Sequence, residues 1–208
     1  METKPEAVIT QLHTLMTLED FKAVMSLDDR DDRLARFSLV TSTFSIEQYC
    51  KRRLLRKKYF ETVNFYGDLV LPLKEYPVRK ILGIFSMTNE KFAVNNGDIL
   101  EPELFRLVPD CGENVDVPFA VEFSPAVKRL GCNAVKVIYI AGYAVEKMPA
   151  DLAAACLELA SWNFNRYRGK RIGLTGSIKG SGKEGEHFEM SMPENVKALL
   201  ETYRRKTI

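Results

Sequence analysis

Side chains that could carry out chemistry are few in this sequence, and they lie far apart. The cysteines are Cys50, Cys111, Cys132 and Cys156, and the histidines are His13 and His187. No two cysteines have the spacing of metal ligands or of a redox pair. A zinc site needs converging nitrogen and sulfur ligands, which this distribution does not indicate. We therefore expect reduced, buried or half-buried thiols and no bound metal.

A glycine-rich stretch from Gly176 to Lys183 invites comparison with a phosphate-binding loop. In the pattern G-x-x-x-x-G-K-[ST], backbone N–H groups hold phosphates and the final hydroxyl binds magnesium. Here Ser177 stands where the first glycine belongs, and Glu184 replaces the hydroxyl residue. The stretch also lacks a preceding strand and a following apolar helix. It favours a flexible linker, and we expect no cofactor.

The sequence also shows no motif for a catalytic nucleophile paired with a general base. The sequence has no G-x-S-x-G turn, and the carboxylate pairs Asp28-Asp29 and Asp31-Asp32 are adjacent in the chain. Acids in such positions are typical of the first turn of a helix, where they complement its dipole. The sequence therefore predicts a protein without enzymatic activity.

Basic residues form three clusters, at 51–58, 166–171 and 204–206. A helix through the first cluster turns by about 100° per residue, which would put four cations on one face. These are Arg52, Arg53, Arg56 and Lys57. Cations at helix C-termini offset the dipole, so a structural role is one interpretation. The other is a surface that docks onto acidic protein groups or phosphates.

The elements that position these residues fall into four stretches. Residues 1–16 show no clear period and predict a loose arm. Residues 17–58 and 149–169 read as a helical core, in which Thr17 and Pro149 are suited to helix starts. The second helix should run from Arg30 to Lys58 with an apolar stripe, and the helix after Pro149 should have another. The first stripe is Leu34, Phe37, Val40 or Thr41, Phe44 and Gln48; the second is Leu152, Cys156, Leu159 or Ala160, Asn163 and Tyr167.

Residues 59–148 change to short β-branched and aromatic runs separated by Gly, Pro and Asn, which is typical of an antiparallel sheet. Residues 170–208 then read as an extended arm and a short helix opened by a capping box at Ser191. Its apolar face is Val196, Leu199, Leu200 and Tyr203, followed by Arg204 and Arg205. The predicted class is α+β: a helical bundle with an antiparallel β-rich insert and a flexible C-terminal arm.

Composition excludes several other classes of protein. The 208 residues are 46% hydrophobic and 28% charged, which is ordinary for a globular chain and excludes a wholly disordered one. The formal net charge of +2 does not indicate a dedicated nucleic-acid binder. No stretch approaches about 18 consecutive apolar residues, and the N-terminal residues lack the apolar region of a signal peptide. We expect a soluble, intracellular protein with no membrane partner.

The order of these elements resembles the head–tail connector (adaptor) family of tailed bacteriophages. Leu18 to Lys22, followed by the acidic junction Asp28–Asp32, is similar to the family's first helix and turn. The segment Tyr49–Leu54 is similar to the end of its second helix, and Val78–Ile81 after Pro77 to its first strand.

The C-terminal half carries the fuller part of this resemblance. A strand Val135–Tyr143 of the pattern V-x-V-x-Y-x-x-G-Y precedes Pro149-Ala150-Asp151-Leu152 and an alanine-rich helix that ends near Arg168. The likeness covers about residues 17–168 and, more loosely, 192–205. The chain departs from the family in its long β insert and in the 170–190 arm.

The resemblance implies a structural virion protein that forms a ring, commonly of twelve subunits, beneath the portal. The ring would prolong the DNA channel without sequence-specific binding and offer a platform for stopper or tail-completion proteins. It would be found in the neck of the virion, and in the host cytoplasm during assembly. Portal docking through the C-terminal region would place Val196, Leu199, Leu200 and Tyr203 in a groove, with Arg204 and Arg205 at its rim. We expect the arm and helix to stay loose until the portal binds.

Two alternatives remain open on the sequence. One is another neck or tail-completion protein of the same particle. The other is a DNA-binding regulator that uses the 51–58 basic helix, which predicts DNA binding with a steep salt dependence.

Overall fold

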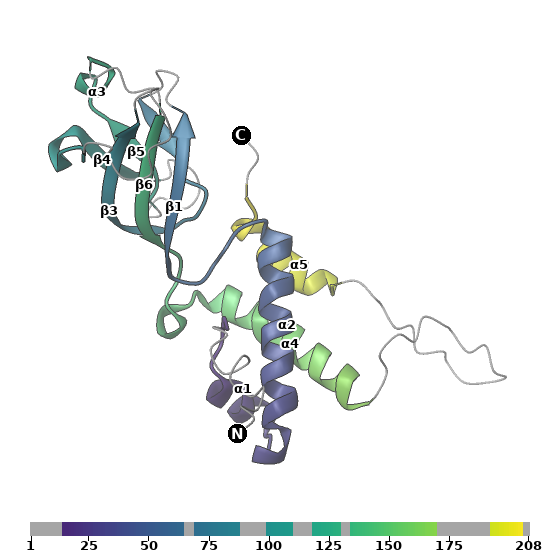
Figure 1. Ribbon diagram of the computed structural model, residues 1–208. Helices are drawn as coiled ribbons and strands as arrows, with labels where there is room; N and C mark the ends of the chain where they lie inside the picture. The colour runs from purple at the N-terminus through teal and green to yellow at the C-terminus, as the bar shows by residue number, and fades with distance from the viewer. Residues whose placement is uncertain are drawn as a thin grey trace, which may run out of the picture. The chain divides into compact units, whose positions relative to one another are not determined.

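The computed structural model describes residues 14–64, 69–87, 99–109, 118–129, 134–169 and 192–205. They form an α+β fold, as predicted, divided into two compact units (Figure 1). The helical unit is formed by residues 1–52 and 145–208, and the β unit by residues 53–144. The β insert expected at 59–148 thus begins six residues earlier and ends four residues earlier.

The helical unit contains four α-helices and short 3₁₀ turns within its described residues. The helices are α1 (Leu18–Met25), α2 (Asp32–Cys50), α4 (Ala150–Arg168) and α5 (Glu194–Leu200). The 3₁₀ turns are η2 (Asp29–Asp31), η4 (Val145–Lys147) and η5 (Glu201–Tyr203).

Helix α1 begins at the predicted cap residue. The Thr17 hydroxyl accepts a hydrogen bond from the Asp20 N–H at 3.0 Å, which is the expected N-cap. Ser26 ends the helix in the left-handed region with φ 51°. Leu15, in the expected loose arm, is instead buried, and its N–H donates to the Thr43 hydroxyl at 3.1 Å. Residues 1–13 of that arm lie outside the described residues.

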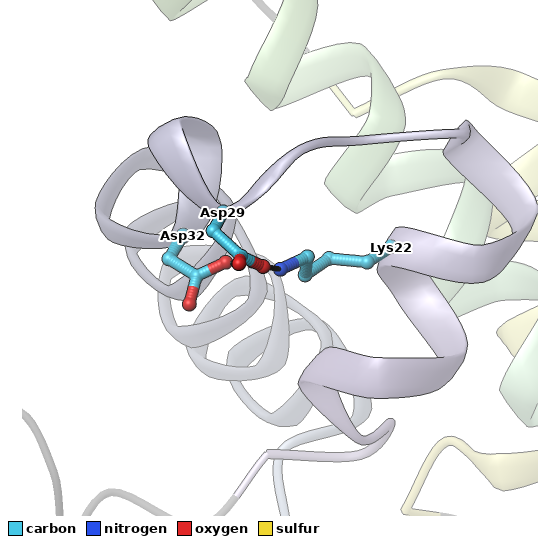
Figure 2. A network of polar contacts seen from close by, with 3 residues as sticks. All are labelled: Lys22, Asp29 and Asp32. Carbon is cyan, nitrogen blue, oxygen red and sulfur yellow. Dashed lines mark hydrogen bonds and ion pairs between the residues drawn. The ribbon is translucent and has the colours of Figure 1, made fainter.

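An ion-pair cluster fixes the corner between α1 and α2. The Lys22 Nζ lies 2.5 Å from Asp29 Oδ1 and 2.5 Å from Asp32 Oδ1, so one cation bridges η2 and the first turn of α2 (Figure 2). These hydrogen bonds raise the pKa of Lys22 and lower that of Asp29. Two of the acids that the sequence assigned to a helix start therefore have a cationic partner.

Helices α2 and α4 pack together, and their buried faces mix small and large side chains. The buried face of α2 includes Ala35, Ser38, Leu39, Ser42, Thr43 and Ile46; that of α4 includes Leu152, Ala155, Cys156, Leu159, Ala160, Asn163 and Phe164. Inside this contact the Asn163 amide donates to the Ser42 hydroxyl at 2.9 Å. The predicted α4 stripe is thus confirmed in all but Tyr167, which is half-buried.

The predicted stripe of α2 is wrong. Phe37 and Phe44 are 48% and 57% exposed, and the face that is buried instead combines Leu39 and Ile46 with small, partly polar side chains. Alanines and serines allow the backbones of two helices to approach closely, while hydrogen bonds satisfy the buried hydroxyls. Phe44 is consequently left exposed, and Phe37 stays about half exposed while its ring contacts Tyr167 of α4, with 5.2 Å between the ring centroids.

Helix α2 also ends earlier than predicted, at Cys50 instead of Lys58. Lys51 adopts the left-handed conformation with φ 54°, and its N–H bonds back to the last helical turn. Leu54 and Leu55 are then buried in the β unit, where Leu54 O accepts the Tyr143 N–H at 2.7 Å. The chain leaves the helix because burying these two leucines and pairing their backbone stabilises the extended form.

The described residues of the β unit form two three-stranded antiparallel sheets, where the alternating pattern predicts antiparallel sheet structure (Figure 1). The first has the order β1-β6-β3 and the second β2-β5-β4. The strands are β1 (Lys57–Asn64), β2 (Val70–Pro72), β3 (Val78–Met87), β4 (Phe105–Pro109), β5 (Pro118–Phe123) and β6 (Ala134–Ala141), with a short helix α3 (Ala126–Arg129). Their core combines Leu71, Val121 and Phe123 with Ile84, Val135, Val137 and Tyr139. The predicted hairpin turn at Asn95–Asp98 lies outside the described residues.

The backbone at Gly142, within the motif that resembles the connector family, requires a glycine. Its φ is +95°, and a Cβ there would lie 2.5 Å from the Leu55 carbonyl oxygen. The adjacent Tyr143 N–H and C=O bond to Leu54 and Arg56. Only glycine permits this close approach of the two backbone segments.

Candidate functional site

The two cysteines that the structure describes are poor candidates for a reactive nucleophile. Cys50 and Cys156 are both fully buried. Burial raises the pKa of Cys50 to about 11 and that of Cys156 to about 12, which keeps both thiols protonated and unreactive. Cys111, Cys132, His13 and His187, and the glycine-rich stretch 176–183, lie outside the described residues.

Neither a metal-binding group nor a membrane-spanning helix is found in the part of the chain that the structure describes. There, no group of three or more His, Cys, Asp or Glu side chains is placed to hold a metal ion. Among the same residues, none of the helices has the length and apolarity needed to cross a membrane.

One buried polar cluster was missed from the sequence. The Tyr139 hydroxyl donates to Glu61 Oε1 at 2.9 Å, and the Lys74 N–H donates to the same oxygen at 3.0 Å. The Glu75 N–H in turn donates to the Tyr139 hydroxyl at 3.2 Å. Glu61 is 8% exposed, and its Oε2 has no hydrogen-bond partner among the described residues.

This cluster fits a structural role better than a catalytic one. Burial, then the Glu61 charge, raises the pKa of Tyr139, so its phenol stays protonated as a donor. Two backbone N–H groups from 74–75 bond to the pair, which ties that segment to strands β1 and β6. The signal for it in the sequence was a single acid at an inward position of an alternating strand.

The predicted basic face does not exist as a helix face. Arg52 lies in the helical unit, is 5% exposed, and its Nε donates to the Tyr203 carbonyl at 2.7 Å. Arg53, Arg56 and Lys57 belong to the β unit, where Lys57 starts β1. These residues lie on both sides of the unit boundary, because the helix that was to align them ends at Cys50. A DNA-binding regulator built on a basic helix at 51–58 is therefore not supported.

The C-terminal segment is packed within the helical unit. Helix α5 lies against α4, and Val196 and Leu200 are fully buried. Leu199 and Tyr203 are half-buried, as is Arg205, whereas Arg204 is exposed. The capping residue Ser191 lies outside the described residues, and α5 begins after Pro193.

Polar contacts also join this segment to other parts of the helical unit. The Tyr203 hydroxyl donates to Asp151 Oδ1 at 2.5 Å, and the Arg205 N–H donates to the Cys50 carbonyl at 2.9 Å. The Tyr49 hydroxyl donates to Glu201 Oε2 at 3.1 Å, with Arg204 stacked over its ring. The expectation that this helix stays loose until a partner arrives is wrong, because its own unit already covers the apolar face. Residues 170–191 of the predicted arm lie outside the described residues.

A second apolar surface, not identified from the sequence, lies on the β1-β6-β3 sheet. Side chains of β1 and β6 alternate, so that Glu61 and Val137 point inward while Phe60 and Ile138 point away from the core. Phe60 is 75% exposed and Leu82 45% exposed. We call this the outer sheet face; it consists of Lys58, Phe60, Thr62, Lys80, Leu82, Phe85, Lys136, Ile138 and Ile140.

The charge on the outer sheet face has one sign. Its three lysines come one from each strand, and the acid of β1, Glu61, points into the core. Lys58 and Lys80 are exposed and Lys136 is half-buried beside the apolar side chains. Such a face suits a partner that is apolar at its centre and acidic at its edge.

Comparison with known proteins relates the fold to phage-like particles. No protein-family model and no curated protein matches the sequence. Among solved structures, a chain in the "Neck of empty GTA particle computed with C6 symmetry" matches with a TM-score of 0.59 and 19% identity, over 100% of this chain and 95% of that chain.

Two further structures agree with this likeness. A chain in the "Neck of native GTA particle computed with C12 symmetry" matches with a TM-score of 0.56 and 19% identity, over 100% of this chain and 94% of that one. A chain in the "Virion of native gene transfer agent (GTA) particle" has the same score and identity, over 93% of this chain and 91% of that chain. At this identity the likeness shows a shared fold.

Proposed function

We propose that this chain is a structural subunit of the neck of a phage-like particle, where it forms the head–tail connector ring. One observation carries the proposal: the whole chain, both units included, has the fold of chains in the neck of gene transfer agent particles. The order of sequence motifs, which resembles the adaptor family, supports the same role.

In this proposal, copies of the chain form a ring, of twelve subunits in the form that the resemblance implies. The matched neck structures were computed with C12 and C6 symmetry, which supports a cyclic assembly. The ring docks beneath the portal, continues the DNA channel without reading sequence, and receives a stopper or tail-completion protein. It assembles in the host cytoplasm and remains in the virion neck.

The proposal keeps portal docking through the C-terminal region but assigns it to a different side of that segment. Because Val196 and Leu200 are covered, the contact would use the outward side of the segment, with Leu199 and Tyr203 half-buried and Arg204 exposed. Arg205, whose backbone N–H donates to the Cys50 carbonyl, follows Arg204 in the chain. Docking would then occur on a preformed surface and not by ordering of a loose helix.

The experiment is deletion of the gene for this chain from the genome that encodes the particle. We expect DNA-filled heads and separate tails to accumulate, and purified protein added to the lysate to restore joined particles. Electron microscopy counts the joined and separate forms. Normal numbers of joined particles after deletion, or absence of the chain from purified particles, would contradict the proposal.

A further inference from the structure

A ring of identical subunits requires two different patches on each copy that fit one another, since a head-to-tail contact is not self-matching. The outer sheet face supplies one patch with an apolar centre and lysines around it. Its counterpart must be apolar and acidic. Where such a surface exists on the same chain, the protein itself can supply the partner.

Helix α1 has that chemistry on its exposed side. Glu19, Asp20, Ala23 and Val24 are all exposed, and positions one, four and five apart fall on one side of a helix. Val24 is 61% exposed, the highest value for a large hydrophobic side chain among the described residues of the helical unit. The cation of this helix, Lys22, is held by Asp29 and Asp32, so it does not offset the two acids.

We infer that the outer sheet face of one copy binds the exposed side of helix α1 of the next copy, with Val24 packed against Phe60. Glu19 and Asp20 then meet Lys58 and Lys136. This inference rests on the proposed ring and names the contact that closes it. A stable interface uses roughly 20 to 30 residues a side, so these two patches form its centre and their neighbours the rim.

The complementarity of the patches explains two features that folding of one copy does not. An aromatic side chain that is 75% exposed in the middle of a strand contributes little to the stability of a single copy. Three lysines around it also disfavour pairing of two identical sheet faces, because like charges would be opposed. The contact is therefore heterologous, as a ring requires.

Charge reversal and its rescue test the inference on the full-length chain. Lys58→Glu with Lys136→Glu should lower the ring fraction by about tenfold or more, and so should Glu19→Lys with Asp20→Lys. All four changes in one chain should restore rings, because the ion pairs re-form with opposite sign. If one of these double variants has a lowered melting temperature, the single reversals Lys58→Glu and Glu19→Lys replace the double ones, each alone and then both in one chain. Ring mass is measured by native mass spectrometry, alone and with tail-less heads.

A matched control reverses exposed cations elsewhere: Arg33→Glu with Arg36→Glu on α2 should leave the rings unchanged. Cross-linking gives an independent measurement, with Phe60→Cys on one batch of protein and Val24→Cys on another. Rings assembled from the two batches should give dimers linked through these two introduced thiols. A mixture with Phe44→Cys in place of Phe60→Cys should give no such dimers.

The outcomes separate this inference from the proposed function. Rings that form normally in both charge-reversed variants, or that cross-link in the Phe44→Cys mixture and not in the Phe60→Cys mixture, overturn the contact but leave the ring in place. A chain that stays monomeric at every concentration, with and without heads, overturns both.

Discussion

Two apolar surfaces of this protein, that of helix α5 and that of the outer sheet face, differ in what covers them. Val196 and Leu200 look like a docking face in the sequence, yet both are fully buried within the helical unit. Phe60 lies in an ordinary alternating strand, yet it is 75% exposed. The apolar content of a segment therefore does not tell whether it is available to a partner; that depends on what the rest of the chain places over it.

The largest effect is expected from shortening a covered side chain. Leu200→Ala should lower the free energy of unfolding by about 2–5 kcal/mol, because it removes packed methyl groups and leaves a cavity. Urea unfolding followed by circular dichroism measures this loss. The surface mutation Ala198→Ser, at an exposed position of the same helix, is the control and should change stability by less than about 0.5 kcal/mol. Equal values for the two variants would mean that α5 does not pack as described.

The second effect is expected from a rise in pH, which should lower the free energy of unfolding through the buried thiols. The pKa of Cys50 is about 11 and that of Cys156 about 12 in the folded protein, against an ordinary value of 9.0. Above about pH 9 the unfolded chain therefore releases protons that the folded chain retains. Stability is complete below that pH and falls by about 1.4 kcal/mol per unit for each thiol as pH rises towards the folded pKa. Tyr139, whose pKa is also raised, adds to the fall above pH 10.

Denaturant midpoints measured from about pH 7 to pH 11 test this behaviour. Cys50→Ala with Cys156→Ala should flatten the curve between about pH 9 and pH 10, although the substitutions lower stability at neutral pH. An unchanged curve in this variant would show that neither thiol is responsible.

Removing one hydroxyl from the interior of the β unit should have a smaller effect. Tyr139→Phe deletes the donor to Glu61 and the acceptor for the Glu75 N–H, and should cost about 1–3 kcal/mol because the buried carboxylate loses a partner. Hydrogen exchange at the amide groups of Lys74 and Glu75 should accelerate. The matched change Tyr59→Phe removes a hydroxyl that bonds to the Leu55 carbonyl and should leave exchange at 74–75 unaffected.

The smallest effect on folding is expected at the uncovered surface. Phe60→Ser should change the free energy of unfolding by less than about 0.5 kcal/mol, since the ring is already in contact with solvent. The same substitution should lower ring assembly, while Phe44→Ser on α2 should not. A loss of stability above about 1 kcal/mol in Phe60→Ser would mean that the side chain supports the sheet and is not held for a partner.

The sequence by itself determined the type of most elements. Caps and acids at Thr17, a proline at Pro149 and the stripe Leu152–Cys156–Leu159 act within a few residues, so they can be read without knowledge of the fold. Strict alternation in Val135–Tyr139 likewise requires a strand with one buried face. The α+β class and the likeness of its motif order to the connector family follow from such local signals.

Only the tertiary structure decided which faces are buried and where α2 ends. Its stripe with Phe37 and Phe44 has the period of a core face, but the buried face is that of Leu39, Ser42 and Ile46, while Phe37 stays half exposed beside Tyr167 of α4. The end at Cys50 depends on burial of Leu54 and Leu55 in the β unit, and the covering of α5 depends on α4. Residues distant in sequence supply these contacts, and a local pattern holds no information about what will be packed against it.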